Sequence, residues 1–161
     1  MDHGISLLLP LRIAPSWQGV VRPDQADHLG HMNVQHYVAA VSAGVFALLQ
    51  EAGLDRHDAS RNAVHVAGAH MEIDFFRECW PGETLQLLSA VTQVKTSSVL
   101  FLHELVAGPE QSLAMRCTVR GVCIGVKERR ACPLPEALRL RLAHMAVRLP
   151  PPDADLELPR R

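Results

Sequence analysis

VQHYVAAVSAGVFALL, the segment from Val34 to Leu49, decides how this chain folds. Its large apolar side chains recur at the spacing of an α-helix, and four alanines and Phe46 fill most of the opposite side. A helix that is apolar nearly all round is buried on most of its faces, yet this one is too short to span a membrane comfortably. We therefore expect the rest of the chain to wrap it, with Asn33 as its N-cap and Gly53 as its stop.

The segments around this helix have the patterns of β-strands. We expect a short strand at 17–21, one long or two short strands at 63–76, and further strands at 84–94, 97–106 and 112–127. The short connection after 94 predicts a hairpin, and apolar residues on both faces of 97–106 suit a central strand. The apolar phase of the last strand changes at Gly121, which predicts a β-bulge there. A short helix is expected at 137–146.

This order of elements predicts an α+β fold in which an antiparallel meander of about four strands forms a curved sheet around one long buried helix. We expect an irregular lead-in at 1–15, a single domain at 16–147 and a loose C-terminal tail at 148–161. Sheet edges or an outer sheet face left without a partner favour association with a second subunit.

Composition removes several classes of function. Of 161 residues, 48% are hydrophobic and 20% are charged, with a net charge of -1, which argues against a disordered chain and against a general nucleic-acid binder. The four cysteines form no CxxC pair, so no zinc knuckle or thioredoxin motif is present, and we expect them to be core residues. The apolar run at 5–11 is too short to cross a bilayer and lacks a basic segment before it. We expect a cytoplasmic protein without a membrane partner.

The loop before the helix carries the most informative motif, DHLGHMNVQHY at 27–37. It resembles the D-x-x-G-H-x-N-x-x-x-Y signature of hotdog-fold acyl-CoA thioesterases of the 4-hydroxybenzoyl-CoA thioesterase type. The spacing matches without gaps, and the matching residues are Asp27, Gly30, His31, Asn33 and Tyr37. Segments 72–85 and 129–136 resemble two later parts of the same family, so the resemblance covers roughly residues 17–145.

The resemblance implies a hotdog fold and the hydrolysis of an acyl-CoA to CoA and a free acid, without a cofactor or a metal. It makes Asp27 the catalytic carboxylate, which either attacks the thioester or activates a water. The backbone amide of Val34 then polarises the carbonyl. His31 and Asn33 organise the loop and cap the helix, and His31 is also placed to touch the thioester.

For substrate binding, the resemblance points to Gly30, which permits the tight turn of the loop, and to Tyr37. Arg129 and Arg130 can hold CoA phosphates, although a solvated strand end explains them equally well. The resemblance also implies a homodimer, with a tetramer as the alternative. The site is expected between subunits, with Asp27 on one chain and part of the acyl pocket from the other.

The residue types support this chemistry without the resemblance. Hydrolysis of a thioester needs an oxygen nucleophile and a group that stabilises charge on the carbonyl oxygen, and a carboxylate beside a helix N-terminus provides both. Taken alone, Asp27 is more readily a turn residue that accepts backbone hydrogen bonds. His28, His31 and His36 are of the type that binds zinc, but they cross from a loop into the helix, and we expect no metal site.

Several points stay open. Many family members carry an acidic residue where this chain has Gln25, and Asp24 beside it is not assigned a catalytic role. A weak similarity to proteins of carnitine and betaine metabolism would require an aromatic cage, for which Trp17, Tyr37 and Trp80 are the candidates. The acyl group, the choice between direct attack and water activation, and the CoA contacts are not fixed by the sequence.

Two other functions compete with hydrolysis. The first is a non-catalytic module that binds acyl-CoA or an acyl carrier on the same fold, because a fold alone does not fix a function. The second is a dehydratase for hydroxyacyl thioesters, which would need a paired histidine and carboxylate. The helix has no carboxylate before Glu51, so we rank the dehydratase last.

Overall fold

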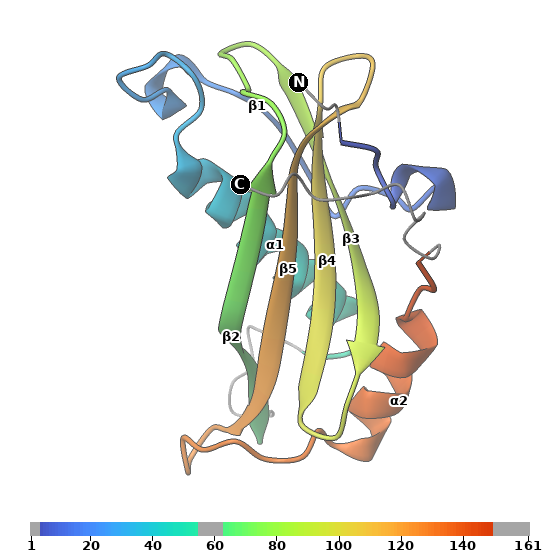
Figure 1. Ribbon diagram of the computed structural model, residues 1–161. Helices are drawn as coiled ribbons and strands as arrows, with labels where there is room; N and C mark the ends of the chain where they lie inside the picture. The colour runs from blue at the N-terminus through green and yellow to red at the C-terminus, as the bar shows by residue number, and fades with distance from the viewer. Residues whose placement is uncertain (1–3, 55–62, 150–161) are drawn as a thin grey trace, which may run out of the picture.

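The computed structural model describes residues 4–54 and 63–149, which form a curled five-stranded antiparallel sheet with a long helix across one face (Figure 1). The long helix, α1, spans Val34–Glu51, and a second helix, α2 (Glu136–Met145), lies beside β3. Two 3₁₀ turns, η1 (Leu9–Leu11) and η2 (Pro23–Gln25), lie before α1. The strands are β1 (Trp17–Val20), β2 (Val64–Phe75), β3 (Thr84–Val94), β4 (Ser98–Ala107) and β5 (Ser112–Gly125). The predicted α+β architecture is confirmed.

The strand order β1-β3-β4-β5-β2 differs from the predicted meander in the place of one strand. The expected β3–β4 hairpin forms, and β4 is the central strand, as predicted. However, β2 pairs with β5 at the far edge of the sheet and not with its successor β3. The chain after β2 therefore crosses one end of the sheet through residues 76–83. A four-strand meander was wrong because local periodicity identifies strands but not the partners with which they pair.

The predicted bulge at Gly121 is also wrong. β5 pairs with β4 without interruption through this residue, and the extra residue is Ala69 in the facing strand β2. Cys117 and Cys123 are both buried, so the inward-facing phase of β5 does not change. Gly121 is required for another reason, because a Cβ there would lie 2.5 Å from Val66 Cγ1 and 3.1 Å from Phe101 Cε2. The apolar side chains that suggested a change of phase belong to the other, half-buried face.

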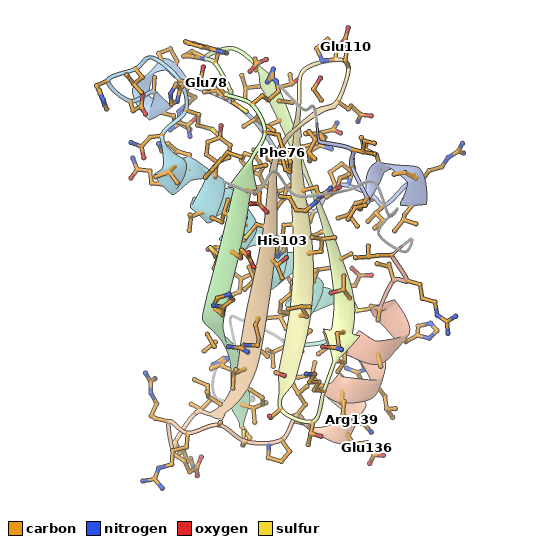
Figure 2. All side chains as sticks on the ribbon, in the orientation of Figure 1. Phe76, Glu78, His103, Glu110, Glu136 and Arg139 are labelled. Carbon is orange, nitrogen blue, oxygen red and sulfur yellow. The ribbon has the colours of Figure 1, made fainter. Side chains whose placement is uncertain are left out.

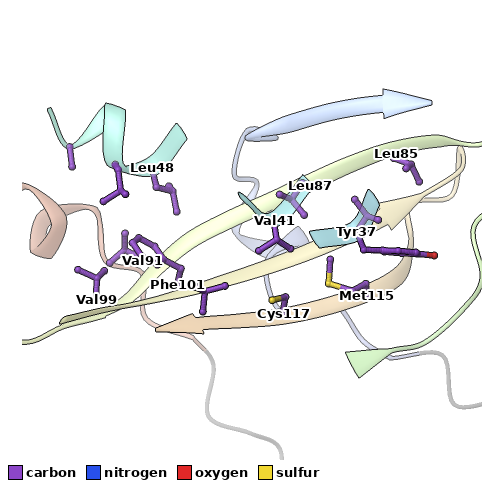
Figure 3. Close-up of a cluster of buried hydrophobic side chains, with 14 of the residues drawn as sticks. Tyr37, Val41, Leu48, Leu85, Leu87, Val91, Val99, Phe101, Met115 and Cys117 are labelled. Carbon is purple, nitrogen blue, oxygen red and sulfur yellow. The ribbon is translucent and has the colours of Figure 1, made fainter. Parts of the chain in front are cut away.

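The core lies between α1 and the inner face of the sheet, as Figure 3 shows. α1 approaches the sheet closely at Gly44, where a Cβ would lie 2.6 Å from Ser89 Oγ. The opposite side of the helix is exposed in the single chain, including Val34 and Ala39. A single chain therefore buries only one side of α1, whereas the apolar sequence of the helix predicts burial on most of its sides. Both predicted ends are confirmed, since Asn33 caps the helix and Gly53 follows it with a φ of +91°.

The lead-in packs on the outer face of the sheet, although it was expected only to be irregular. Leu8 is fully buried and joins a second apolar cluster on this face. The carboxylate of Glu104, also fully buried, accepts hydrogen bonds from the N–H groups of Leu7 (3.1 Å) and Leu8 (2.9 Å) and from Arg116 Nε (2.8 Å). Most of the predicted tail lies outside the described residues, and the domain boundaries stay a prediction.

His103, in the middle of β4, is a fully buried titratable group on the inner face (Figure 2). Its Nδ1 is 2.7 Å from Ser89 Oγ, which in turn is 2.6 Å from Ser16 Oγ. Within the described residues its Nε2 has no hydrogen-bond partner. Burial lowers the pKa of His103 to about 4, so the folded protein keeps this imidazole neutral at neutral pH.

Acidification should therefore destabilise the protein through His103. In the unfolded chain the imidazole has an ordinary pKa near 6.5, so it is protonated at a pH at which the folded protein keeps it neutral. The free energy of unfolding therefore falls as the pH drops from 6.5 towards 4. The loss should reach about 3 kcal/mol. Urea unfolding of wild type and His103→Asn across this pH range measures it, because Asn cannot titrate. A difference between the two proteins that does not change with pH would contradict the prediction.

Candidate active site

A cavity of about 650 Å³ opens where the loop before α1 meets the segment that follows β2. The two segments are far apart in sequence and are joined by a hydrogen bond from the N–H of Met32 to the carbonyl of Cys79 (2.8 Å). Figure 2 shows Phe76 and Glu78 at this end of the sheet. The residues that line the cavity are Asp27, His31, Met32, Asn33, Val34, Tyr37, Phe75, Phe76, Arg77, Glu78 and Trp80.

The loop holds the Asp27 carboxylate by its backbone. The N–H of Asp27 donates to the carbonyl of His31 (2.9 Å), and the N–H of Gly30 donates to the carbonyl of Asp27 (3.0 Å). Gly30 has a φ of +89°, a conformation that favours glycine. Asp27 Oδ1 accepts from the N–H of Leu29 (2.8 Å), whereas Oδ2 makes no hydrogen bond to any residue that the structure describes. One carboxylate oxygen thus fixes the turn and the other remains available at the cavity.

The N-terminus of α1 supplies a backbone donor to the same cavity. Asn33 uses its side-chain oxygen to accept from the N–H of Gln35 (3.0 Å), and its carbonyl accepts from the N–H of His36 (3.0 Å). The N–H of Val34 has no hydrogen-bond partner in the described part of the chain. An unpaired amide at a helix N-terminus carries a partial positive charge and can bind a carbonyl oxygen that is gaining negative charge.

His31 lies between two carboxylates. Its Nδ1 is 3.7 Å from Asp27 Oδ2, and its Nε2 is 3.6 Å from Glu78 Oε1. Both distances exceed those of hydrogen bonds, so the three groups are neighbours and not yet a bonded chain. The ring also meets Trp80 edge-on, at 6.0 Å between centroids and an angle of 87°. The imidazole therefore lies beside the carboxylate, with one ring nitrogen towards Asp27 and the other towards Glu78.

Aromatic side chains are concentrated at this cavity. The sequence has two Trp, one Tyr and four Phe, seven in all, and four of them line it: Tyr37, Phe75, Phe76 and Trp80. Tyr37 and Phe75 are in edge-to-face contact at 5.1 Å. Burial raises the pKa of Tyr37, and the adjacent Cys79 thiol contributes, so the phenol stays neutral. The walls are therefore largely apolar and flat, with polar groups at one side.

The positive charge of Arg77 is already neutralised. Its guanidinium forms a two-point ion pair with Glu83, in which Nη1 lies 3.1 Å from Oε2. Glu83 also accepts from the N–H of Trp80 (2.8 Å), which fixes the turn at 77–83. The carboxylates of Asp27 and Glu78 are thus the main charges that a ligand in the cavity meets.

The structure brings five of the predicted site residues together: Asp27, His31, Asn33, Val34 and Tyr37 all line the cavity. Gly30 shapes the loop but is not among the lining residues. Arg129 and Arg130 are exposed in the loop between β5 and α2, at the opposite end of the sheet (Figure 1). Trp17 lies in β1 and packs against the core.

Sequence reasoning assigned no role at the site to Met32, Phe75, Phe76, Arg77 and Glu78. The only sequence feature that could have placed any of them at the site is the group of aromatic residues within 75–80. Within residues 4–54 and 63–149, no group of three or more His, Cys, Asp or Glu side chains could hold a metal ion. None of the helices in these residues is long and apolar enough to span a membrane.

Comparison with known proteins decides the family. The model of the thioesterase-like superfamily matches residues 21–142, which include the whole cavity. The chain belongs to the thioesterase-like superfamily. A 1,4-dihydroxy-2-naphthoyl-CoA hydrolase from Rippkaea orientalis is 29% identical over 120 residues, covering 73% of this chain and 87% of the relative. The family predicted from the loop motif is confirmed, and with it the enzyme class of thioester hydrolases.

Solved structures show that the fold is that of other thioesterase-like proteins. A 1,4-dihydroxy-2-naphthoyl-CoA thioesterase from Synechocystis superposes with a TM-score of 0.69 at 20% identity, over 79% of this chain and 93% of that one. A Staphylococcus aureus protein in complex with CoA gives 0.76 at 18% identity, over 85% and 88%. A Thermus thermophilus thioesterase complexed with coenzyme A and Zn gives 0.69 at 23%, over 80% and 91%. The predicted hotdog fold is confirmed.

Loss of the Asn33 cap should weaken the start of α1. Asn33→Ala removes the acceptor for the N–H of Gln35 and should lower the free energy of unfolding by about 1 kcal/mol. Asn33→Ser keeps an acceptor at the same place and should restore most of the loss. Urea unfolding of both variants measures the difference. Equal destabilisation by Ala and Ser would show that the cap is not the cause.

Proposed function

We propose that this thioesterase-like protein hydrolyses acyl-CoA thioesters to CoA and a free acid at the cavity beside α1. The proposal rests on one observation: Asp27, with its free Oδ2, and Val34, with its unpaired N–H, line the same cavity in a chain of this family. The CoA complexes of the S. aureus and T. thermophilus structures support a CoA thioester as the substrate. The four cysteines are free, which suits a cytoplasmic enzyme.

The proposed mechanism places the thioester carbonyl oxygen on the N–H of Val34. Negative charge develops there as the carbonyl carbon is attacked, and the amide and helix dipole stabilise it. Asp27 acts from the opposite side in one of two ways. It attacks the carbon itself, giving a mixed anhydride that water then cleaves, or it removes a proton from an attacking water. In both routes the C–S bond breaks, CoA leaves as the thiolate, and a proton from water completes the thiol.

His31 is proposed as a positioning residue for the carboxylate. It stands 3.7 Å from Asp27 Oδ2 and is braced on its far side by Glu78 and by the edge of Trp80. A small shift on substrate binding would bring His31 Nδ1 within hydrogen-bond distance, since catalytic contacts are often long in unliganded enzymes. His31 then holds Asp27 in the orientation that the reaction needs.

We further propose that the acyl group is apolar and preferably aromatic. Four aromatic side chains line the cavity, and flat rings pack well against one another in edge-to-face or offset arrangements. The R. orientalis relative, named for an aromatic acyl-CoA, supports the same class. A cage for trimethylammonium is less well supported, because Trp17, one of its three candidates, packs elsewhere.

Thiol release from a panel of acyl-CoAs tests the proposal. The panel contains aromatic, short, branched, long-chain and betainyl thioesters, and we expect the highest kcat/KM for an aromatic one. Asp27→Asn should lower kcat about 100- to 10,000-fold, because the carboxylate provides the nucleophile or the general base. The KM should change much less, since Asn has the same shape.

Asp24→Asn is the matched control for this substitution. Asp24 lies three residues before Asp27, is exposed, and pairs with Arg22 at 3.0 Å outside the cavity. Its replacement removes the same charge and should leave turnover within about twofold, as expected for a screened surface pair. CoA binding without turnover of any thioester, or equal turnover by wild type and Asp27→Asn, would favour a non-catalytic binding module instead.

We propose that the enzyme is a homodimer formed through α1 and β2. β2 pairs with β5 alone among the described strands, so its other edge is open. Large apolar side chains are exposed on these two elements, with Val34 54%, Met71 39% and Phe75 53% exposed. Exposed apolar surface beside an open edge favours a subunit contact. Because Arg129 and Arg130 lie far from this chain's cavity, they would meet CoA phosphates only at the cavity of another subunit.

Sedimentation should show a particle of about twice 17.7 kDa at micromolar concentrations. Met71→Glu places a charge on the proposed contact and should raise the dimer dissociation constant at least about tenfold. Leu140→Glu is the matched control, since Leu140 is equally apolar and 54% exposed but lies on α2. A fully active monomer of the wild type would contradict the proposal.

A further inference from the structure

Two cysteines face each other at the end of the sheet opposite the cavity. Cys123 is near the end of β5, Cys132 lies in the segment that leads into α2, and their sulfur atoms are 3.6 Å apart. The N–H of Cys132 donates to the carbonyl of Cys123 (2.9 Å), and Ile124 and Ala131 form an antiparallel β-bridge. In this register the two cysteines are directly opposite one another.

That register suits a disulfide. Opposed residues of antiparallel strands have Cα atoms about 4.5 to 5.5 Å apart, and disulfides join Cα atoms about 4.4 to 6.8 Å apart. The sulfur atoms, at 3.6 Å, are already in contact. The register therefore places the two cysteines at a separation that a disulfide can bridge.

The two thiols differ in accessibility. Cys132 is half-buried, whereas Cys123 is fully buried, as are the remaining cysteines Cys79 and Cys117. A small oxidant in solution thus reaches Cys132 first. Burial raises the pKa of the Cys123 thiol, and the contact with Cys132 contributes. Together with the difference in accessibility, this assigns the first reaction to Cys132 and the second to Cys123.

We propose that Cys123 and Cys132 are a redox pair that hydrogen peroxide converts into a reversible intramolecular disulfide. Cys132 loses its proton, and its thiolate attacks one oxygen of the peroxide as the O–O bond breaks, which gives a sulfenic acid. The departing hydroxide takes up the proton that Cys132 released and leaves as water. Cys123 then attacks the sulfur of Cys132. The S–S bond forms as the S–O bond breaks, and the proton of Cys123 leaves with the hydroxide as a second water. Two electrons pass from the thiols to the peroxide.

The disulfide would tie α2 to the sheet. It closes a ring over residues 123–132, and the chain just beyond it is anchored by the N–H of Leu134, which donates to the carbonyl of Thr96 (2.8 Å). Leu138 and Leu142 of α2 then pack into the main core. A cross-link at the start of this segment restricts the unfolded chain and should raise the melting temperature.

Peptide mapping on the full chain tests the proposal directly. Trypsin cuts after Lys and Arg, so each cysteine falls in a different peptide: Cys79 in 78–95, Cys117 in 117–120, Cys123 in 121–127 and Cys132 in 131–139. Every possible pairing therefore gives a distinct cross-linked mass. After hydrogen peroxide we expect 121–127 joined to 131–139, two of the four thiols lost, and a melting temperature higher by about 5 °C. Dithiothreitol should reverse all three changes.

Two variants separate this pair from general thiol oxidation. Cys132→Ser should abolish the cross-link and the rise in melting temperature. Cys117→Ala, which removes a buried thiol six residues away on β5, should preserve both. Oxidation of Cys132 to a sulfinic acid without a cross-link, a cross-link between two chains, or retention of all four thiols in excess peroxide would each overturn the proposal.

Discussion

The hydrogen bond from the N–H of Met32 to the carbonyl of Cys79 joins the two segments on which the site depends. Both residues are buried, so water cannot replace either partner, and breaking this bond would leave two unsatisfied polar groups. It exists because β2 pairs at the far edge of the sheet, which forces residues 76–83 to cross the end of the sheet beside the loop that precedes α1. The topology of one strand thus brings the aromatic wall to the loop that carries Asp27.

The sequence was informative where a function depends on local geometry. Asn33 as a cap, Gly53 as a stop and the loop motif around Asp27 are read from residues close together in the chain, and the structure places the first two as predicted. Long-range pairing is not encoded in this way. The position of β2 and the role of Gly121 depend on which strands become neighbours, and apolar residues on both faces of β5 concealed its true phase. For the same reason Phe76 and Glu78 were not expected at the cavity.

The start of α1 shows how local bonding leaves one group for a ligand. Asn33 satisfies the amides of Gln35 and His36, and its own N–H donates to the carbonyl of Gln25 (2.9 Å). The amide of Val34 has no partner among the residues that the structure describes, and Val34 lines the cavity. This amide can therefore bind a carbonyl oxygen, and the interaction is strongest when that oxygen becomes negative. The cap that stabilises the helix therefore also selects the amide that can serve catalysis.

The distribution of aromatic residues between the core and the cavity also supports a role for the cavity in binding. The buried residues of the main core are mostly aliphatic or sulfur-containing; away from the site, Phe101 is buried in this core and Trp17 packs against it. If aromatic rings were needed only for core packing, they would be spread along the inner face of the sheet. Instead, four of the seven surround one cavity, where Phe75 and Trp80 remain half exposed, at 53% and 47%. Leaving large rings partly in water costs free energy that a flat apolar ligand, or a second subunit, would recover.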